Sequence, residues 1–77
     1  MNDEIRLDFA PLRHRRRLLG VSQRALAPLC GGCHPSLISH WERNARMPSA
    51  LQLVRLARAL GTPTFMLFDV IEPKEKK

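Results

Sequence analysis

The sequence predicts an all-α fold, a compact five-helix bundle. The chain has 77 residues, enough for one small domain but too few for a two-domain enzyme or a barrel. Apolar residues recur at three- and four-residue spacing in short segments, whereas alternation with a period of two is almost absent. Glycine, proline and asparagine residues separate these segments and predict where each helix begins and ends.

The first two helices are expected in the N-terminal half of the chain. For the helix from position 8 or 9 to position 19, Asp8 can cap the start and Gly20 can end it in a left-handed turn. The second helix should begin at Ser22 and end at Gly31-Gly32. Because Pro28 removes a backbone hydrogen bond, the last part of this helix should be distorted or end early. The apolar face of the first helix holds Phe9, Leu12, Arg16 and Leu19.

Three further helical segments follow. The third helix should open at His34 or Pro35, where proline loses no useful donor, and Asn44 can end it. The fourth should open at Pro48 and end at Gly61, and a short fifth helix or turn should follow. The apolar residues of these segments are Leu37, Ile38 and Trp41 in the third, Leu53, Leu56, Ala57 and Leu60 in the fourth, and Phe65, Leu67 and Phe68 in the fifth.

The charge of the chain is basic and unevenly distributed. The chain holds 13 Lys and Arg against 7 Asp and Glu, a net charge of +6. Residues 9–68 hold nine arginines and one acid, Glu42, so this part carries +8 and the two ends together carry −2. We expect an N-terminal arm (1–8), the folded domain (9–68) and a C-terminal tail (69–77). A basic bundle indicates a polyanionic partner and favours DNA over a membrane bound by a basic tail.

The sequence also predicts the cellular compartment of the protein. No apolar stretch approaches the roughly 18–20 residues that span a bilayer, and the acidic N-terminus is unlike a secretory signal. We therefore expect a cytoplasmic protein with no membrane partner, in which both cysteines are thiols.

Several fragments, in order and at nearly fixed spacing, resemble the lambda-repressor-like helix-turn-helix domain (the Cro/repressor or XRE family). They are Gly20-Val21-Ser22-Gln23, Leu26-Ala27, Ile38-Ser39-His40-Trp41-Glu42-Arg43-Asn44, Pro48-Ser49 and Leu56-Ala57-Arg58-Ala59-Leu60-Gly61. The resemblance implies a five-helix DNA-binding domain that usually works as a dimer on a palindromic operator. Two departures concern the second helix: Pro28 replaces a good helix former, and Gly31-Gly32 resembles a one-residue insertion.

By the resemblance, the third helix enters the major groove and reads bases. The base-facing positions and their neighbours are Pro35, Ser36, Leu37, Ser39 and His40. His40 can bond the N7 or O6 edge of guanine, and Leu37 can touch a thymine methyl. Because none of these residues is Arg, Asn or Gln, specificity would rest partly on DNA shape or water. The alternative is that His40 is only a solvated helix residue.

The resemblance also implies residues that contact phosphates: Arg16, Gln23, Arg43, Asn44 and Arg46. In the family, the residue at the position of Gln23 also supports the recognition helix. Family members that carry Arg16 and Glu42 pair them in an internal salt bridge between the first and third helices. A buried carboxylate needs a partner, and arginine offers a bidentate one. The alternative for the phosphate-contacting residues is that they are ordinary solvated side chains. Trp41 is expected to lie in the core.

The string Cys30-Gly31-Gly32-Cys33-His34 matches the haem c attachment motif, but no export signal accompanies it. Zinc would have three ligands, Cys30, Cys33 and His34, and no clear fourth. The leading interpretation is that the cysteines pack the turn as small apolar residues. The alternatives are a redox switch that shifts the recognition helix, a metal site and a haem site. We therefore expect no metal and no cofactor.

The sequence holds no catalytic constellation, so we do not expect an enzyme. The leading interpretation is a small transcriptional regulator, acting as a repressor or autoregulator on double-stranded DNA; activation through contact with RNA polymerase is the alternative within this class. A protein-binding adaptor with the same fold and a thiol redox-responsive regulator are further alternatives. A homodimer is expected to form through Phe65, Met66, Phe68, Val70 and Ile71.

Overall fold

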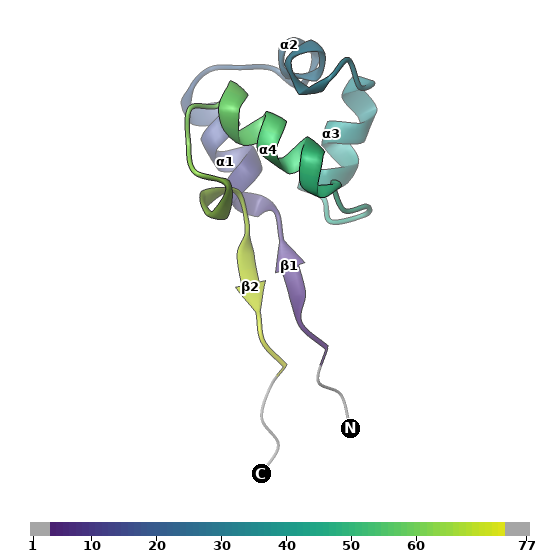
Figure 1. Cartoon of the computed structure of the whole chain (residues 1–77), viewed down its shortest axis with the longest axis vertical. Helices are drawn as coiled ribbons and strands as arrows, with labels where there is room; N and C mark the ends of the chain where they lie inside the picture. Colours follow the sequence, from purple (N-terminus) through teal and green to yellow (C-terminus); the bar gives the residue numbers. More distant parts are fainter. Residues whose placement is uncertain (1–3, 74–77) are drawn as a thin grey trace.

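The computed structural model describes residues 4–73, and within them helices form a bundle from which a two-stranded ribbon projects (Figure 1). The elements are β1 (Arg6–Asp8), α1 (Ala10–Leu18), α2 (Gln23–Leu26), the 3-10 helix η1 (Ala27–Cys30), α3 (Pro35–Glu42), α4 (Ala50–Ala59), the 3-10 helix η2 (Thr64–Leu67) and β2 (Asp69–Ile71). The predicted helical bundle is confirmed. The count of five α-helices is not, because the fifth segment is one 3-10 turn that ends where Phe68 becomes extended.

The limits of the first two helices follow from local chemistry. Phe9 precedes α1, and the Asp8 carboxylate accepts a hydrogen bond from the Ala10 amide at 3.0 Å. At the start of α2, the Ser22 hydroxyl accepts from the Ala25 amide at 3.0 Å. The α-helix then stops at Leu26 and tightens into η1 around Pro28, as the missing amide of this proline predicts.

The later helices also begin at polar caps. His34 caps α3 through its ring nitrogen, and Pro35 is the first helical residue. The expectation that Pro48 opens α4 is wrong by two positions, because Ser49 is extended and acts as the cap. Its hydroxyl accepts from the Gln52 amide at 3.1 Å, and the Gln52 side chain accepts from the Ser49 amide at 2.8 Å. Asn44 ends the α3 turn with a φ of 62°.

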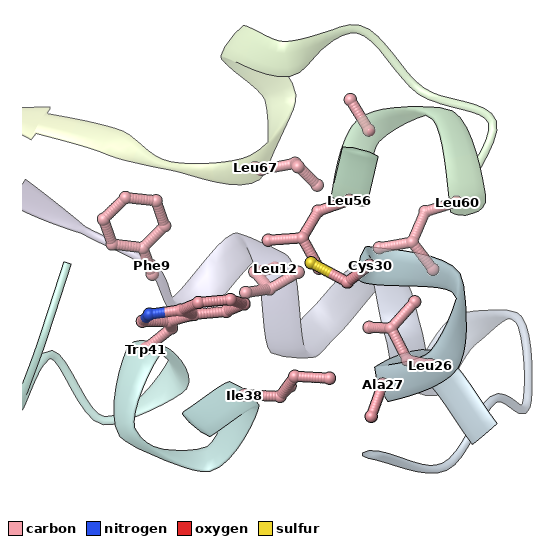
Figure 2. Close-up of a cluster of buried hydrophobic side chains, with 11 residues drawn as sticks. Phe9, Leu12, Leu26, Ala27, Cys30, Ile38, Trp41, Leu56, Leu60 and Leu67 are labelled. Carbon is pink, nitrogen blue, oxygen red and sulfur yellow. The ribbon is translucent and has the colours of Figure 1, made fainter. Parts of the chain in front are cut away.

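The core lies where α1, η1, α3 and α4 meet (Figure 2). Trp41 is 1% exposed, so the expectation that it belongs to the core is confirmed. The ring of Phe9 contacts the ring of Phe68, with centroids 5.7 Å apart. The other members of the core are Leu12, Leu26, Ala27, Cys30, Ile38, Leu56, Ala57, Leu60 and Leu67.

The ribbon joins the two segments that we expected to be an arm and a tail. Strand β1 pairs with β2 in antiparallel register, with Leu7 opposite Val70 and Asp8 opposite Asp69. The ribbon leaves the bundle on the side away from α2 (Figure 1). Strands of three residues are too short to show alternation in a sequence, so the pattern did not predict them. The end of the expected charged tail, residues 74–77, lies outside the described residues.

None of the helices within residues 4–73 has the length and apolar character that crossing a membrane requires.

Candidate nucleic-acid interface

Helix α3 has one face in the core and one polar face outside it. Ile38, Trp41 and Glu42 are buried. Ser36 is exposed, and Ser39 and His40 are half-buried. Of the five residues expected at the bases, Pro35 and Leu37 are also half-buried, and Leu37 packs against the core. The polar face of α3 is therefore formed mainly by two serines and one histidine.

The buried carboxylate of Glu42 connects α1, α2 and α3. Glu42 at the end of α3 accepts from Nε of Arg16 at 2.6 Å and from Nη2 of Arg16 at 3.0 Å. Nε2 of Gln23 donates to Oε1 of Glu42 at 3.0 Å. The expected ion pair between Arg16 and Glu42 is thus present, and Gln23 braces it from α2. Because each helix contributes one group, the carboxylate fixes α2 and α3 relative to α1.

The guanidinium of Arg16 makes a further hydrogen bond within the protein, and most of its side chain is buried. Its Nη1 donates to the carbonyl oxygen of Val21 at 2.9 Å, and its side chain is 9% exposed. The hydrogen bond to Glu42 raises the pKa of Arg16, against the opposing effect of burial. Three N–H groups of the guanidinium are therefore used within the protein, and the expectation that Arg16 also contacts a phosphate stays a prediction.

The segment after α3 carries three of the residues expected at phosphates, Arg43, Asn44 and Arg46. Arg43 and Arg46 are exposed. Nε of Arg43 donates to the carbonyl oxygen of Ser39 at 3.3 Å, and Nη2 of Arg43 lies 3.3 Å from Nδ1 of His40. Arg43 and His40 therefore sit together on one side of α3, where a phosphate contact and a base contact would be neighbours.

Asn44 has a structural connection that the sequence did not indicate. Its Oδ1 accepts from the Phe9 amide at 2.8 Å, and its Nδ2 donates to Oδ1 of Asp8 at 2.9 Å. Hydrogen bonds from Asn44 and from the Ala10 amide lower the pKa of Asp8. Asparagine at this position indicated only a left-handed backbone; no local pattern indicates a partner 35 residues away.

The basic charge of the bundle lies on its surface. Glu42 is the only acid in residues 9–68, and its charge is neutralised internally by Arg16. Of the remaining eight arginines, Arg15 is half-buried and the others are exposed. A surface of this charge attracts a polyanion over a range that salt limits.

The two cysteines and the histidine of the string from Cys30 to His34 have separate surroundings in the structure. Cys30 and Cys33 are free thiols, and Cys30 belongs to the core. His34 turns towards the start of α3, where its Nδ1 accepts from the Ser36 amide at 3.1 Å. Within residues 4–73, no three His, Cys, Asp or Glu side chains lie close enough together to hold a metal ion.

The residues expected at a dimer interface fall into two groups. Phe65 and Met66 on η2 are exposed, and so are Val70 and Ile71 on β2. Phe68 differs, because its ring is half-buried against Phe9 within the same chain. Four of the five residues are therefore available to a partner.

Comparison with known proteins agrees with this architecture. A family described as Helix-turn-helix matches residues 12–67. The restriction-modification controller protein C.AhdI from Aeromonas hydrophila is 36% identical, over 77% of this chain and 88% of that one, with a TM-score of 0.71. The DNA-binding domain of the P22 c2 repressor in solution is 33% identical, over 87% of this chain and 84% of that one, with a TM-score of 0.72.

A crystal structure of the P22 c2 repressor in complex with a synthetic operator is also similar. It is 32% identical, over 75% of this chain and 88% of that one, with a TM-score of 0.69. A comparison with curated proteins gives no significant match. The family match spans most of the chain and includes all of α2, α3 and α4. The chain therefore belongs to the lambda-repressor-like (XRE) helix-turn-helix family of DNA-binding transcriptional regulators.

Proposed function

We propose that this chain is a sequence-specific repressor or autoregulator that binds a palindromic operator as a homodimer. The observation that carries the proposal is the polar outer face of α3, held in place from α1 and α2 by Glu42. A helix that is fixed on its inner side and polar on its outer side can enter the major groove as a rigid unit. The operator-bound P22 c2 repressor, a structural neighbour, supports the same mode.

Base reading is assigned to the N-terminal part of α3. Ser36, Ser39 and His40 present hydroxyl and imidazole groups to base edges, and the imidazole can bond guanine. Pro35 and Leu37 lie beside them, where an apolar side chain can contact a thymine methyl. Because this set has no side chain that makes a strong bidentate contact, DNA shape and bridging water contribute to specificity.

Phosphate contacts are assigned to residues around this face. Gln23 stands at the first turn of α2, and Arg43, Asn44 and Arg46 form the loop that follows α3. Each cation neutralises a phosphate and releases counterions, so it adds affinity and salt dependence but no sequence reading. The half-buried side-chain amide of Gln23 donates to Glu42, and in this proposal the same amide also contacts a phosphate.

A two-fold dimer places the apolar residues of η2 and β2 between two copies. Phe65, Met66, Val70 and Ile71 are exposed there, and Phe65 is 69% exposed. Helix α3 packs against α1 and α2, whereas η2 packs against α1 and α4, so an interface through η2 and β2 leaves the polar face of α3 uncovered. Two copies related by a two-fold axis read half-sites about one helical turn apart.

Selection of bound sites from random double-stranded DNA tests the proposal most directly. The expected result is a palindromic site. The logarithm of the binding constant should fall linearly with the logarithm of the salt concentration, with a slope of about −0.9 for each neutralised phosphate. Sedimentation of the free and DNA-bound protein should give a dimer on the site. In vitro transcription from a promoter that carries the site should decrease; an increase would indicate an activator. Binding that is sequence-blind and independent of salt would contradict the proposal and favour a protein-binding adaptor.

A further inference from the structure

The proposed function leaves two thiols in the helix-turn-helix turn without a role. Cys30 is the last residue of η1, and Cys33 directly precedes His34, the cap of α3. We propose that Cys30 and Cys33 are a modification site: they close reversibly into an intramolecular disulfide that weakens DNA binding by displacing the start of α3. The regulatory part of this inference rests on the proposed function.

The two thiols are close in the chain and are held only weakly by other groups. Only Gly31 and Gly32 separate Cys30 from Cys33, and the Cys33 thiol is one of the neighbours that raise the pKa of Cys30. Their hydrogen-bond contacts are long: Sγ of Cys30 lies 3.7 Å from the carbonyl oxygen of Gln52, and Sγ of Cys33 lies 3.8 Å from that of Ala27. Thiols are weak donors, so a covalent bond can replace these contacts at little cost.

The residues between the two cysteines allow the backbone to adjust. Gly31 has a φ of 83° and Gly32 a φ of 76°. A disulfide requires a dihedral angle near ±90° about the sulfur–sulfur bond and Cβ atoms about 3.8 Å apart. Two glycines can change their dihedral angles to meet this requirement, because they lack the Cβ that restricts other residues.

The two cysteines differ in accessibility, which sets the order of the reaction. Cys33 is half-buried, whereas Cys30 is 2% exposed, among Leu12, Leu56 and Leu60 of the core (Figure 2). Burial, together with the neighbouring Cys33 thiol, raises the pKa of Cys30 to about 11, and the charge of Arg55 opposes this rise. Cys33 therefore reacts first with a reagent from solution, and Cys30 reacts second.

The reaction balances with a small-molecule disulfide such as glutathione disulfide as the oxidant. The Cys33 thiolate attacks one sulfur of glutathione disulfide, forms a mixed disulfide and releases one glutathione thiolate. The Cys30 thiol then gives up its proton to that base or to water and attacks the sulfur of Cys33. The second glutathione leaves, so two protein thiols are oxidised and one glutathione disulfide is reduced to two glutathione thiols.

Closure of the bond moves Cys33 more than Cys30, because the core holds Cys30 in place. Cys33 is bonded directly to His34, whose ring caps the Ser36 amide at 3.1 Å. A shift of Cys33 therefore disturbs the cap and the first turn of α3, which carries Pro35 and Ser36. These are residues of the proposed base-reading face, so oxidation should weaken operator binding.

The experiment compares the reduced protein with protein treated with glutathione disulfide. Alkylation followed by intact mass measurement counts the free thiols, and fluorescence anisotropy measures affinity for the selected operator. The expected result is a monomeric chain that loses both thiols and binds the operator at least tenfold more weakly, with full recovery in dithiothreitol. The matched control, Cys33→Ala, should bind like the reduced protein and show no response to the oxidant.

Several results would overturn the inference. They are retention of both thiols, disulfides formed only between chains, and an oxidised protein whose operator affinity changes less than twofold. A reduced protein that binds no DNA would instead defeat the proposed function. In that case the thiol count and the NMR shift of the Ser36 amide on oxidation decide the modification site by themselves: a closed disulfide with a displaced Ser36 signal supports it, and an unchanged signal overturns it.

Discussion

Gln23 and Glu42 are joined by a hydrogen bond of 3.0 Å across the turn between α2 and α3. The oxygen of Glu42 that accepts this bond also accepts from Nη2 of Arg16. One carboxylate thus receives donors from α1 and α2 while it belongs to α3. The relative position of the helices therefore depends on a single buried acid.

Glu42→Ala should destabilise the fold by about 3–5 kcal/mol, because the change leaves the buried charge of Arg16 without a partner. The free energy of unfolding in urea measures this effect. The double variant Arg16→Met, Glu42→Leu is the control, and it should recover most of the loss because no charge stays buried. If the single variant loses less than about 0.5 kcal/mol, a typical surface effect, Glu42 does not hold the helices together.

Asn44 contributes both a left-handed backbone and two side-chain hydrogen bonds, and two substitutions separate them. Asn44→Gly keeps the backbone conformation and removes the bonds to Asp8 and Phe9, at an expected loss of about 1–2 kcal/mol. Asn44→Ala should lose about 1–2 kcal/mol more, because alanine is strained at a φ of 62°. Thermal and urea unfolding measure both losses. Equal losses for the two variants would show that the backbone conformation contributes nothing.

The lowered pKa of Asp8 makes the stability of the fold depend on pH in the acidic range. Because the folded protein favours the carboxylate, the contribution of Asp8 is complete above the ordinary carboxyl pKa of about 3.9. It is lost as the pH falls through the lower folded value. Asp8→Asn should therefore flatten the acid limb of a plot of unfolding free energy against pH. An NMR titration of the Asp8 carboxyl carbon gives the pKa directly, and a midpoint at or above the ordinary value would contradict the prediction.

Gly31 and Gly32 should respond differently to alanine. Both have positive φ, so each substitution should cost about 1–2 kcal/mol from backbone strain. A Cβ on Gly31 would also lie 2.5 Å from Nη1 of Arg55, whereas a Cβ on Gly32 meets no atom within 4 Å. Gly31→Ala should thus cost somewhat more. In an Arg55→Ala background the difference between the two glycines should disappear, which unfolding in urea can check.

The DNA-facing residues should separate into two kinds in binding measurements. His40→Ala should relax the base preference at one position of the selected site, with a loss of about 1–3 kcal/mol for the preferred base. Arg46→Ala should weaken binding to all sequences and reduce the salt slope by about 1. Anisotropy on the selected and a scrambled site, at several salt concentrations, distinguishes these outcomes. A salt slope that stays the same in Arg46→Ala would remove Arg46 from the phosphate contacts.

Much of the fold was predictable because its signals are local. The cap at Ser22, the early end of α2 before Pro28 and the left-handed backbone of Asn44 each depend on a few neighbouring atoms. The start of α4, two residues later than expected, also reflects local chemistry, because Ser49 and Gln52 form a capping box there.

The features that the sequence did not predict depend on contacts between residues far apart in the chain. Leu7 and Val70 form the ribbon from opposite ends of the chain, and neither segment has enough residues to show a strand pattern. The placement of Arg55 over Gly31 likewise arises only when α4 packs beside η1. At the candidate site, the pairing of Arg16 with Glu42 was implied by the family resemblance, and it agrees with the need of a buried carboxylate for a partner. The hydrogen bond from Arg16 to the carbonyl oxygen of Val21, by contrast, became visible only in the structure.

The ribbon has a consequence for the order in which the protein assembles. Pairing Arg6 with Ile71 closes a loop that contains almost the whole chain, and such a closure has a high entropic cost in an unfolded polypeptide. Once Phe9 and Phe68 meet in the bundle, the two strands are already neighbours and most of this cost has been met. The ribbon therefore forms last and opens first, and its amides exchange with solvent hydrogen while the helices stay folded.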